Sequence, residues 1–176
     1  MRDAQRPAAV PPAVLTANYA KEKGEGIVYG GILIAGVLIL YAITRTPALA
    51  TIGALAVLGV ALYHWPFVGR DRRAMEISPS GLVVERLGRL PWNAIASVEI
   101  VDRYLRAIRN ADLRIELRRP LETAVDDAAK VHPLRRAMYR CWRVTGPQQI
   151  TVKLSTLDAK PEVVRAAIVQ YLGRAI

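Results

Sequence analysis

Two long apolar runs, separated by a single charged residue, constrain this chain more than any other feature of its sequence. The runs cover residues 26–44 and 47–68, and Arg45 is the one formal charge within residues 26–69. A helix rises 1.5 Å per residue, so a helix over either run comes close to the roughly 30 Å thickness of a bilayer core. The sequence therefore predicts a two-helix transmembrane hairpin over residues 26–69.

Two other structures can produce such runs. One is a pair of buried core helices, but soluble helices rarely lack a polar face over two consecutive runs of this length. The other is a cleaved signal peptide, because Lys21 and Lys23 precede the first run and residues 48–50 (Ala-Leu-Ala) match a cleavage site. The long leader, the position of Arg45 and the second run all favour the hairpin.

Basic residues flank the hairpin at both ends and predict its orientation. Lys21 and Lys23 precede the first span, and Arg70, Arg72 and Arg73 follow the second. Lysine and arginine are retained on the cytoplasmic side of a membrane. We therefore expect both termini in the cytoplasm, with the short turn between the spans as the translocated segment.

The hairpin also contains residues with expected structural roles in a bilayer. Aromatic side chains near the end of the second span are expected at headgroup level as interface anchors, and these are Tyr63, Trp65 and Phe67. Small residues at GxxxG-type spacing are expected to let the helices approach closely, and these are Gly26, Gly30, Gly31 and Ala35. Neither span contains Asp, Glu or Lys, which argues against an ion or proton pathway.

The chain carries a net charge of +10, and most of the excess is arginine after the hairpin. A basic domain held at the cytoplasmic leaflet lies beside anionic lipid, where each basic group gains on the order of 1 kcal/mol. Nucleic acid is the alternative partner, but no helix-turn-helix, RNP or finger pattern appears. We therefore expect the membrane and anionic lipid headgroups as partners, and a larger membrane-protein complex or a homo-oligomer as further candidates.

Residues that carry common catalytic chemistry are sparse. Cys141 is the single cysteine, so neither an internal disulfide nor a cysteine-cluster metal site is expected. His64 lies among aromatic residues and His132 precedes a proline, and neither belongs to a metal or base motif. We expect no catalytic residue, cofactor or metal. An enzyme acting on a lipid-linked substrate is a weaker alternative, because Asp126 and Asp127 would face different directions on a helix.

Alternating side chains predict an antiparallel sheet after the hairpin. Residues 112–118 alternate strictly between aliphatic and charged side chains, as in a strand with one buried face. The expected strands cover residues 75–77, 82–87, 96–100, 112–118 and 150–155. A C-terminal helix is expected over residues 161–172, with an apolar stripe that covers the sheet and Gly173 as its stop signal.

Two segments lie outside the expected hairpin, strands and C-terminal helix. Residues 1–25 are expected to form a disordered cytoplasmic tail, with residues 13–20 as an optional helical turn on the membrane. Residues 120–145 form a basic insertion in which 133–143 read as an amphipathic helix. That helix either lies in the headgroup zone or packs on the sheet, and a third option makes 139–144 an extra strand. The expected lipid or partner contacts are Arg70, Arg72, Arg73, Arg135, Arg136, Arg140, Trp142 and Arg143.

Two stretches of the soluble part resemble a known family. Gly81 opens a strand, and Pro91, Trp92, Ile95 and Val98 form a Pro-Trp-x-x-Ile-x-x-Val run. These residues resemble the first strands of the bacterial pleckstrin-homology-like domain family of small membrane proteins, in which a two-helix transmembrane hairpin precedes the domain.

The resemblance implies an α+β membrane protein whose residues 70–176 form a cytoplasmic antiparallel β half-barrel closed by a C-terminal helix. It also implies a multi-pass protein of the bacterial inner membrane with a scaffold or accessory role and no reaction. Eukaryotic pleckstrin-homology domains cluster Lys and Arg around their first hairpin, whereas the turn at residues 78–81 has none. Specific phosphoinositide binding is therefore not expected there, and Trp92 is expected to be a core anchor.

Overall fold

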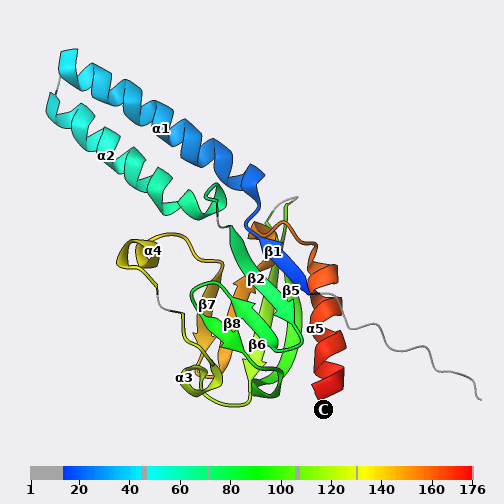
Figure 1. The fold of residues 1–176 in the computed structure, drawn as a ribbon. Helices are drawn as coiled ribbons and strands as arrows, with labels where there is room; N and C mark the ends of the chain where they lie inside the picture. The colour runs from blue at the N-terminus through cyan, green and yellow to red at the C-terminus, as the bar shows by residue number, and fades with distance from the viewer. Residues whose placement is uncertain (1–13, 45–46, 71, 106–107, 130, 176) are drawn as a thin grey trace, which may run out of the picture.

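Two antiparallel helices project from a β domain (Figure 1). The computed structural model of the chain describes residues 14–44, 47–70, 72–105, 108–129 and 131–175. Helix α1 covers Lys21–Thr44 and helix α2 covers Pro47–Tyr63. Within the described residues, α1 is the one helix long and apolar enough to cross a membrane by length and composition, with a mean hydropathy of 2.3 in its apolar window. Arg45 lies outside the described residues.

Helix α2 is shorter than the predicted second span. It ends at Tyr63, and the chain continues as a short 3₁₀ helix, η1, over Trp65–Phe67. Pro66 lacks the backbone N–H that an α-helix would need at this position. The expectation that the span continues to Val68 was therefore wrong.

Small side chains form the contact between α1 and α2. Ala35 and Ala42 of α1 and Ala54 and Ala61 of α2 are all buried. A Cβ added at Gly31 would lie 3.2 Å from the Cβ of Ala61, so Gly31 and Ala35 face the partner helix as predicted. Small residues let two helices approach closely when their larger side chains point outward.

The other two small residues of the predicted packing set lie elsewhere. A Cβ added at Gly26 or at Gly30 would meet nothing within 4 Å. Their position on α1 turns them away from α2, so they were wrongly assigned to the helix contact.

The strand before the hairpin pairs with the strand after it. Strand β1 covers Leu15–Asn18 and pairs antiparallel with β2, which covers Arg73–Ser78. The predicted disordered tail, and the optional helical turn within it, are therefore wrong for residues 14–25, while residues 1–13 lie outside the described residues. The β domain begins before the hairpin, and the hairpin is an insertion between two paired strands.

The β domain consists of two four-stranded antiparallel sheets. The first has the order β1-β2-β3-β4 and the second has the order β5-β6-β8-β7. The remaining strands are β3 (Gly81–Val84), β4 (Gly88–Leu90), β5 (Ile95–Leu105), β6 (Ile108–Leu117), β7 (Trp142–Gly146) and β8 (Gln149–Lys153). Each of the five predicted strands has a counterpart, and the alternation in β6 buries Leu113, Ile115 and Leu117.

Buried side chains from both sheets form one core that the C-terminal helix covers. Helix α5 spans Pro161–Ala175, so Gly173 does not end it, and its Val164 and Ile168 are buried. Trp92 belongs to a 3₁₀ helix, η2 (Trp92–Ala94), and stacks on Tyr171 with ring centroids 5.3 Å apart. Its indole Nε1 donates to the Ser78 carbonyl at 3.0 Å, so the predicted core role is confirmed. The α+β class, two antiparallel sheets and a C-terminal helix are thus established.

The basic insertion between β6 and β8 contains less helix than expected. Helix α3 covers Leu121–Ala124 and helix α4 covers Pro133–Ala137. The predicted helix over 133–143 ends early, because β7 begins at Trp142 and pairs with β8. The extra-strand alternative is the one that the structure favours, shifted toward the C-terminus.

Candidate functional site at the base of the hairpin

The outer surface of the hairpin is apolar along both helices. Large aliphatic side chains there are strongly exposed, with relative exposures of 67% for Leu33, 79% for Leu49 and 65% for Ile52. An exposed apolar surface much larger than an ordinary patch marks an interaction with a membrane or another protein. The β domain lies at one end of this surface, where α1 begins and α2 ends (Figure 1).

Aromatic rings join the hairpin to the β domain. Phe67 lies 5.2 Å from the ring of Tyr19 and 5.0 Å from the ring of Tyr139, and His64 stacks on Tyr139 at 6.1 Å. The Tyr139 N–H also donates to the Tyr63 carbonyl at 2.8 Å, which links the segment before β7 directly to α2.

The predicted interface anchors divide into two groups. Tyr63 and Trp65 are exposed at the end of α2, with relative exposures of 45% and 40%. Phe67 is 4% exposed and faces the β domain. Phe67 was therefore wrongly assigned as a membrane anchor, because the turn at Pro66 directs it into the junction.

The start of α1 is held just as closely. A Cβ at Gly24 would lie 2.1 Å from the Cβ of Phe67, so the helix and η1 touch there without space for a side chain. Lys23 Nζ donates to the Ser155 carbonyl, and the Ala20 N–H donates to the Thr156 carbonyl at 2.9 Å. Both ends of the hairpin are thus fixed to the domain.

A half-buried carboxylate organises the polar contacts below this junction. Glu85 Oε2 accepts from the Tyr19 hydroxyl at 2.5 Å, and Glu85 Oε1 accepts from Arg135 Nε at 2.9 Å and Nη2 at 2.5 Å. The Glu85 carbonyl accepts from Trp142 Nε1 at 2.8 Å. One residue therefore connects β1, the β3–β4 turn, α4 and β7.

Burial changes the proton affinities of the groups in this network. The pKa of Tyr19 is raised, first by burial and then by the negative charges that Cys141 and Glu85 can carry. Burial also raises the pKa of the Cys141 thiol to about 11. The Tyr139 pKa is raised, mainly by burial. All three groups are held in their neutral forms at physiological pH.

The predicted lipid or partner contacts do not form one surface. Arg135 is committed to Glu85, with 26% of its side chain exposed, and is not free to bind a ligand. Arg136 and Arg140 are exposed, and the Arg140 guanidinium lies 4.6 Å from the centre of the Trp142 ring. Trp142 is 9% exposed and hydrogen-bonded, so it is a packed residue that presents one ring face.

The other predicted arginines lie apart from this group. Arg143 is exposed on β7, on the opposite face from Trp142, because successive strand residues alternate. Arg70 and Arg73 are exposed beside the end of the hairpin, and Arg73 pairs with Glu76 at 3.1 Å. Arg72 is half-buried, and its carbonyl accepts from the Tyr19 N–H at 2.7 Å.

Three residues that matter at this site were missed in the sequence. Tyr19 lies in the predicted tail, and Glu85 and Arg86 lie in the predicted strand 82–87, where neither was singled out. Tyr19 contacts Glu85, while Glu85 and Arg86 contact Arg135 of α4, so sequence neighbours carry no signal of these contacts. Among the residues that the structure describes, no group of three or more His, Cys, Asp or Glu side chains is arranged to hold a metal ion.

Comparisons with protein-family models, with curated proteins and with solved structures found no match to this chain.

Proposed function

We propose that this chain is a membrane-anchored scaffold or accessory protein without enzymatic activity. The hairpin crosses the bacterial inner membrane twice, with both termini in the cytoplasm. The β domain adopts a pleckstrin-homology-like fold and docks anionic lipid headgroups or a membrane-protein partner at the membrane surface.

The exposed apolar surface of the hairpin carries the proposal. Ile43 is 78% exposed and Leu49 is 79% exposed at the tip, far from any packing against the β domain. In water such a surface would drive aggregation, whereas in a bilayer it contacts lipid of matching polarity. Charged residues lie at the base, where Lys21 pairs with Glu25 at 3.1 Å.

The length of α2 is compatible with a thin or locally thinned bilayer. Its 17 residues rise about 26 Å, against about 30 Å for a typical hydrocarbon core. A mismatch of this size costs fractions of a kcal/mol per Å and is relieved by bilayer thinning or by flanking residues that reach the interface. Tyr63 and Trp65, exposed at the end of α2, are suited to that interface.

The pairing of β1 with β2 supports the expected orientation. Because Asn18 pairs with Arg73, the two ends of the hairpin lie side by side at the same sheet. A hairpin with this connection places the segments before and after it on one side of a membrane. The basic residues on both flanks favour the cytoplasmic side.

The domain architecture supports the pleckstrin-homology-like assignment. Two antiparallel sheets share one core, and α5 covers one end of it through Trp92 and Tyr171. The Pro-Trp-x-x-Ile-x-x-Val run contributes side chains to this core, because Trp92 and Ile95 are buried in it.

Membrane extraction tests the anchoring. We expect the full chain to remain in the pellet after washing with high salt and with alkaline carbonate, because apolar contacts survive both treatments. A matched variant replaces residues 21–70 with a two-residue turn and keeps β1. This variant should move to the soluble fraction at high salt. Release of the full chain by carbonate, or retention of the variant at high salt, would contradict the proposal.

Protease accessibility tests the orientation. In inside-out vesicles the cytoplasmic face is outside, so the β domain should be digested without detergent. In spheroplasts the β domain should be protected until detergent is added. The reverse pattern would place the termini on the other side and would overturn the assignment of the cytoplasmic face.

A further inference from the structure

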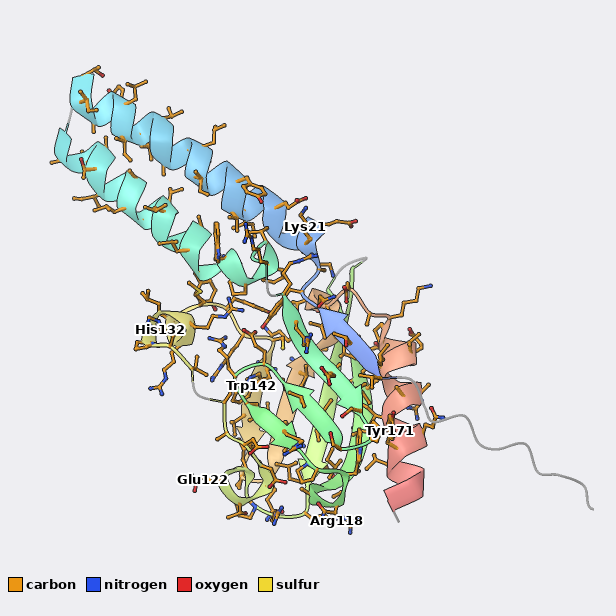
Figure 2. All side chains as sticks on the ribbon, in the orientation of Figure 1. Lys21, Arg118, Glu122, His132, Trp142 and Tyr171 are labelled. Carbon is orange, nitrogen blue, oxygen red and sulfur yellow. The ribbon has the colours of Figure 1, made fainter. Side chains whose placement is uncertain are left out.

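A basic hollow lies between the β3–β4 turn and α4. It has a volume of about 330 Å³ and is lined by Arg86, Ala129, Val131, Arg136, Arg140 and Trp142. Half of these residues are arginines, and none of them is acidic. Figure 2 shows His132, the residue before α4, near the end of α2, with Trp142 between it and the far end of the β domain, where Arg118 and Glu122 lie. The hollow is therefore on the hairpin side of the domain.

Arg86 lines this hollow and carries its unpaired donors. Its Nη1 donates to the Met138 carbonyl at 3.1 Å and to the Arg135 carbonyl. Its Nε and Nη2 are buried and have no hydrogen-bond partner in the described part of the chain. Buried N–H groups that lack an acceptor are rare in proteins, and for a charged group the penalty is larger. An acceptor supplied by a ligand would remove this penalty.

The nearby carboxylates are already occupied. Glu85, next to Arg86 in the chain, accepts from Tyr19 and Arg135. Asp127 pairs with Arg89. No ion pair of Arg136 or Arg140 with a described carboxylate is found within 4 Å. The positive charge of the hollow is thus not neutralised by described side chains.

We infer that this hollow binds a phosphate group. Guanidinium groups donate pairs of parallel hydrogen bonds that match phosphate oxygens, and three of them suit the double charge of a phosphate monoester. Arg86 supplies the two buried donors, and Arg136 and Arg140 supply exposed charge at the rim. This deepens the proposed function, because at the base of a membrane hairpin the phosphate can come from a lipid headgroup as well as from a soluble phosphate.

Binding is tested on the full chain in two arms. In the first, inorganic phosphate is titrated into protein in a nonionic detergent at constant ionic strength. In the second, the protein is placed in nanodiscs of phosphatidylcholine with or without phosphatidic acid. The readouts are tryptophan fluorescence, because Arg140 lies over the Trp142 ring, and the thermal unfolding midpoint. A saturable change in either arm supports the site, and a change confined to phosphatidic acid assigns the lipid headgroup as the source.

Three substitutions and a matched control locate the binding. Arg136→Gln and Arg140→Gln should each weaken binding about three- to tenfold, and both side chains are exposed, so the fold should be retained. Arg86→Lys should weaken it about tenfold, because a lysine cannot offer two parallel donors. Arg143→Gln removes the same charge on the other face of β7 and should leave binding unchanged.

Two results would overturn the inference. One is the absence of a saturable response in both arms. The other is an equal loss of binding in Arg143→Gln and Arg140→Gln, which would mean diffuse electrostatic attraction. A failure of membrane anchoring can be distinguished from a failure of phosphate binding, because the titration with inorganic phosphate needs no bilayer. A chain that binds phosphate but is released by carbonate would keep this site and refute the anchor.

Discussion

At the scale of single residues, Glu85 links four parts of the domain that are distant in sequence. Its side chain is 14% exposed, its carboxylate accepts from both Arg135 and Tyr19, and its carbonyl accepts from Trp142. A partly buried carboxylate with several donors is coupled more strongly to its partners than a surface ion pair is. Glu85 therefore holds α4 in place. Helix α4 carries Arg136 and supplies the Arg135 carbonyl that accepts from Arg86, so both arginines are positioned at the basic hollow.

A double-mutant cycle measures this coupling. We expect Glu85→Gln, Arg135→Gln and the double variant to give an interaction energy of about 1–2 kcal/mol in urea unfolding of the full chain in detergent. The exposed pair of Glu99 and Arg114, at 3.4 Å, serves as the control and should give about 0.5 kcal/mol or less. Equal values for the two cycles would mean that Glu85 acts as an ordinary surface charge.

Alkaline pH should destabilise the fold through Tyr19 and Cys141. Both pKa values are raised in the folded protein, so the unfolded chain loses these protons first and the free energy of unfolding falls as pH rises. The contribution of Cys141 is lost as the pH rises from its unfolded pKa of about 9 to its folded pKa of about 11, and it amounts to on the order of 3 kcal/mol. The contribution of Tyr19 to the free energy of unfolding begins to be lost above about pH 10, where tyrosine ionises in the unfolded chain.

Urea unfolding from pH 8 to pH 11 checks this pH dependence. Cys141→Ala should flatten the curve between pH 9 and pH 10 and leave the steeper loss above pH 10, where Tyr19 ionises in the unfolded state. Stability that stays constant up to pH 11 would mean that neither group is buried as described.

At the scale of elements, the contact between α1 and η1 fixes how the hairpin joins the domain. Gly24 and Phe67 meet with no space between them, and Phe67 continues the contact into the rings of Tyr19 and Tyr139. The junction is therefore a packed interface and not a flexible linker. Its geometry sets how far the basic hollow lies from the end of α2.

Gly24→Ala tests this junction. The new methyl group would clash with the Cβ of Phe67, which cannot move without its backbone, so we expect a loss of about 1–3 kcal/mol despite the better helix propensity of alanine. Gly26→Ala, two residues away, meets nothing within 4 Å and should be neutral or slightly stabilising. Thermal unfolding in detergent compares them, and identical midpoints would contradict the packed junction.

Local sequence patterns predicted the elements that have a clear periodicity of apolar residues or a clear turn signal. The alternation of residues 112–118 gave β6, and the apolar stripe after Pro161 gave α5. The turn at 78–81 was also predicted, and Gly81 is required there because its φ is +139° and a Cβ would lie 2.4 Å from the Leu90 carbonyl oxygen. Strand β1 was missed, because Leu15–Asn18 has no strong alternation and its partner lies beyond the hairpin.

The candidate site was predictable only in part, because some of its residues meet through contacts between distant segments of the chain. Arg136, Arg140 and Trp142 stood out as a basic segment with an aromatic residue. Their arrangement depends on Glu85 and Arg86, which reach α4 through tertiary contacts. Hydrogen bonds between segments about 50 residues apart leave no periodic pattern in the sequence.

At the scale of the whole molecule, the hairpin is an insertion into a β-sheet edge. Tyr19 follows β1 and is fully buried, and its hydroxyl reaches Glu85 in the β3–β4 turn. The residues before the hairpin are thus part of the folded domain, and a fragment without the hairpin must keep them. Cutting at residue 70 would leave β2 as an unpaired edge.

Two soluble fragments test this organisation. The first contains residues 70–176, and the second joins residues 14–20 to residues 72–176 through an Asn-Gly turn, which suits an antiparallel pair. We expect the second fragment to be more stable in urea by about 3 kcal/mol or more, because it retains the buried Tyr19 and the β1–β2 hydrogen bonds. Amide exchange should also be slower in β2 of the second fragment. Equal stability and equal exchange would mean that β1 is dispensable, and the domain would then begin after the hairpin.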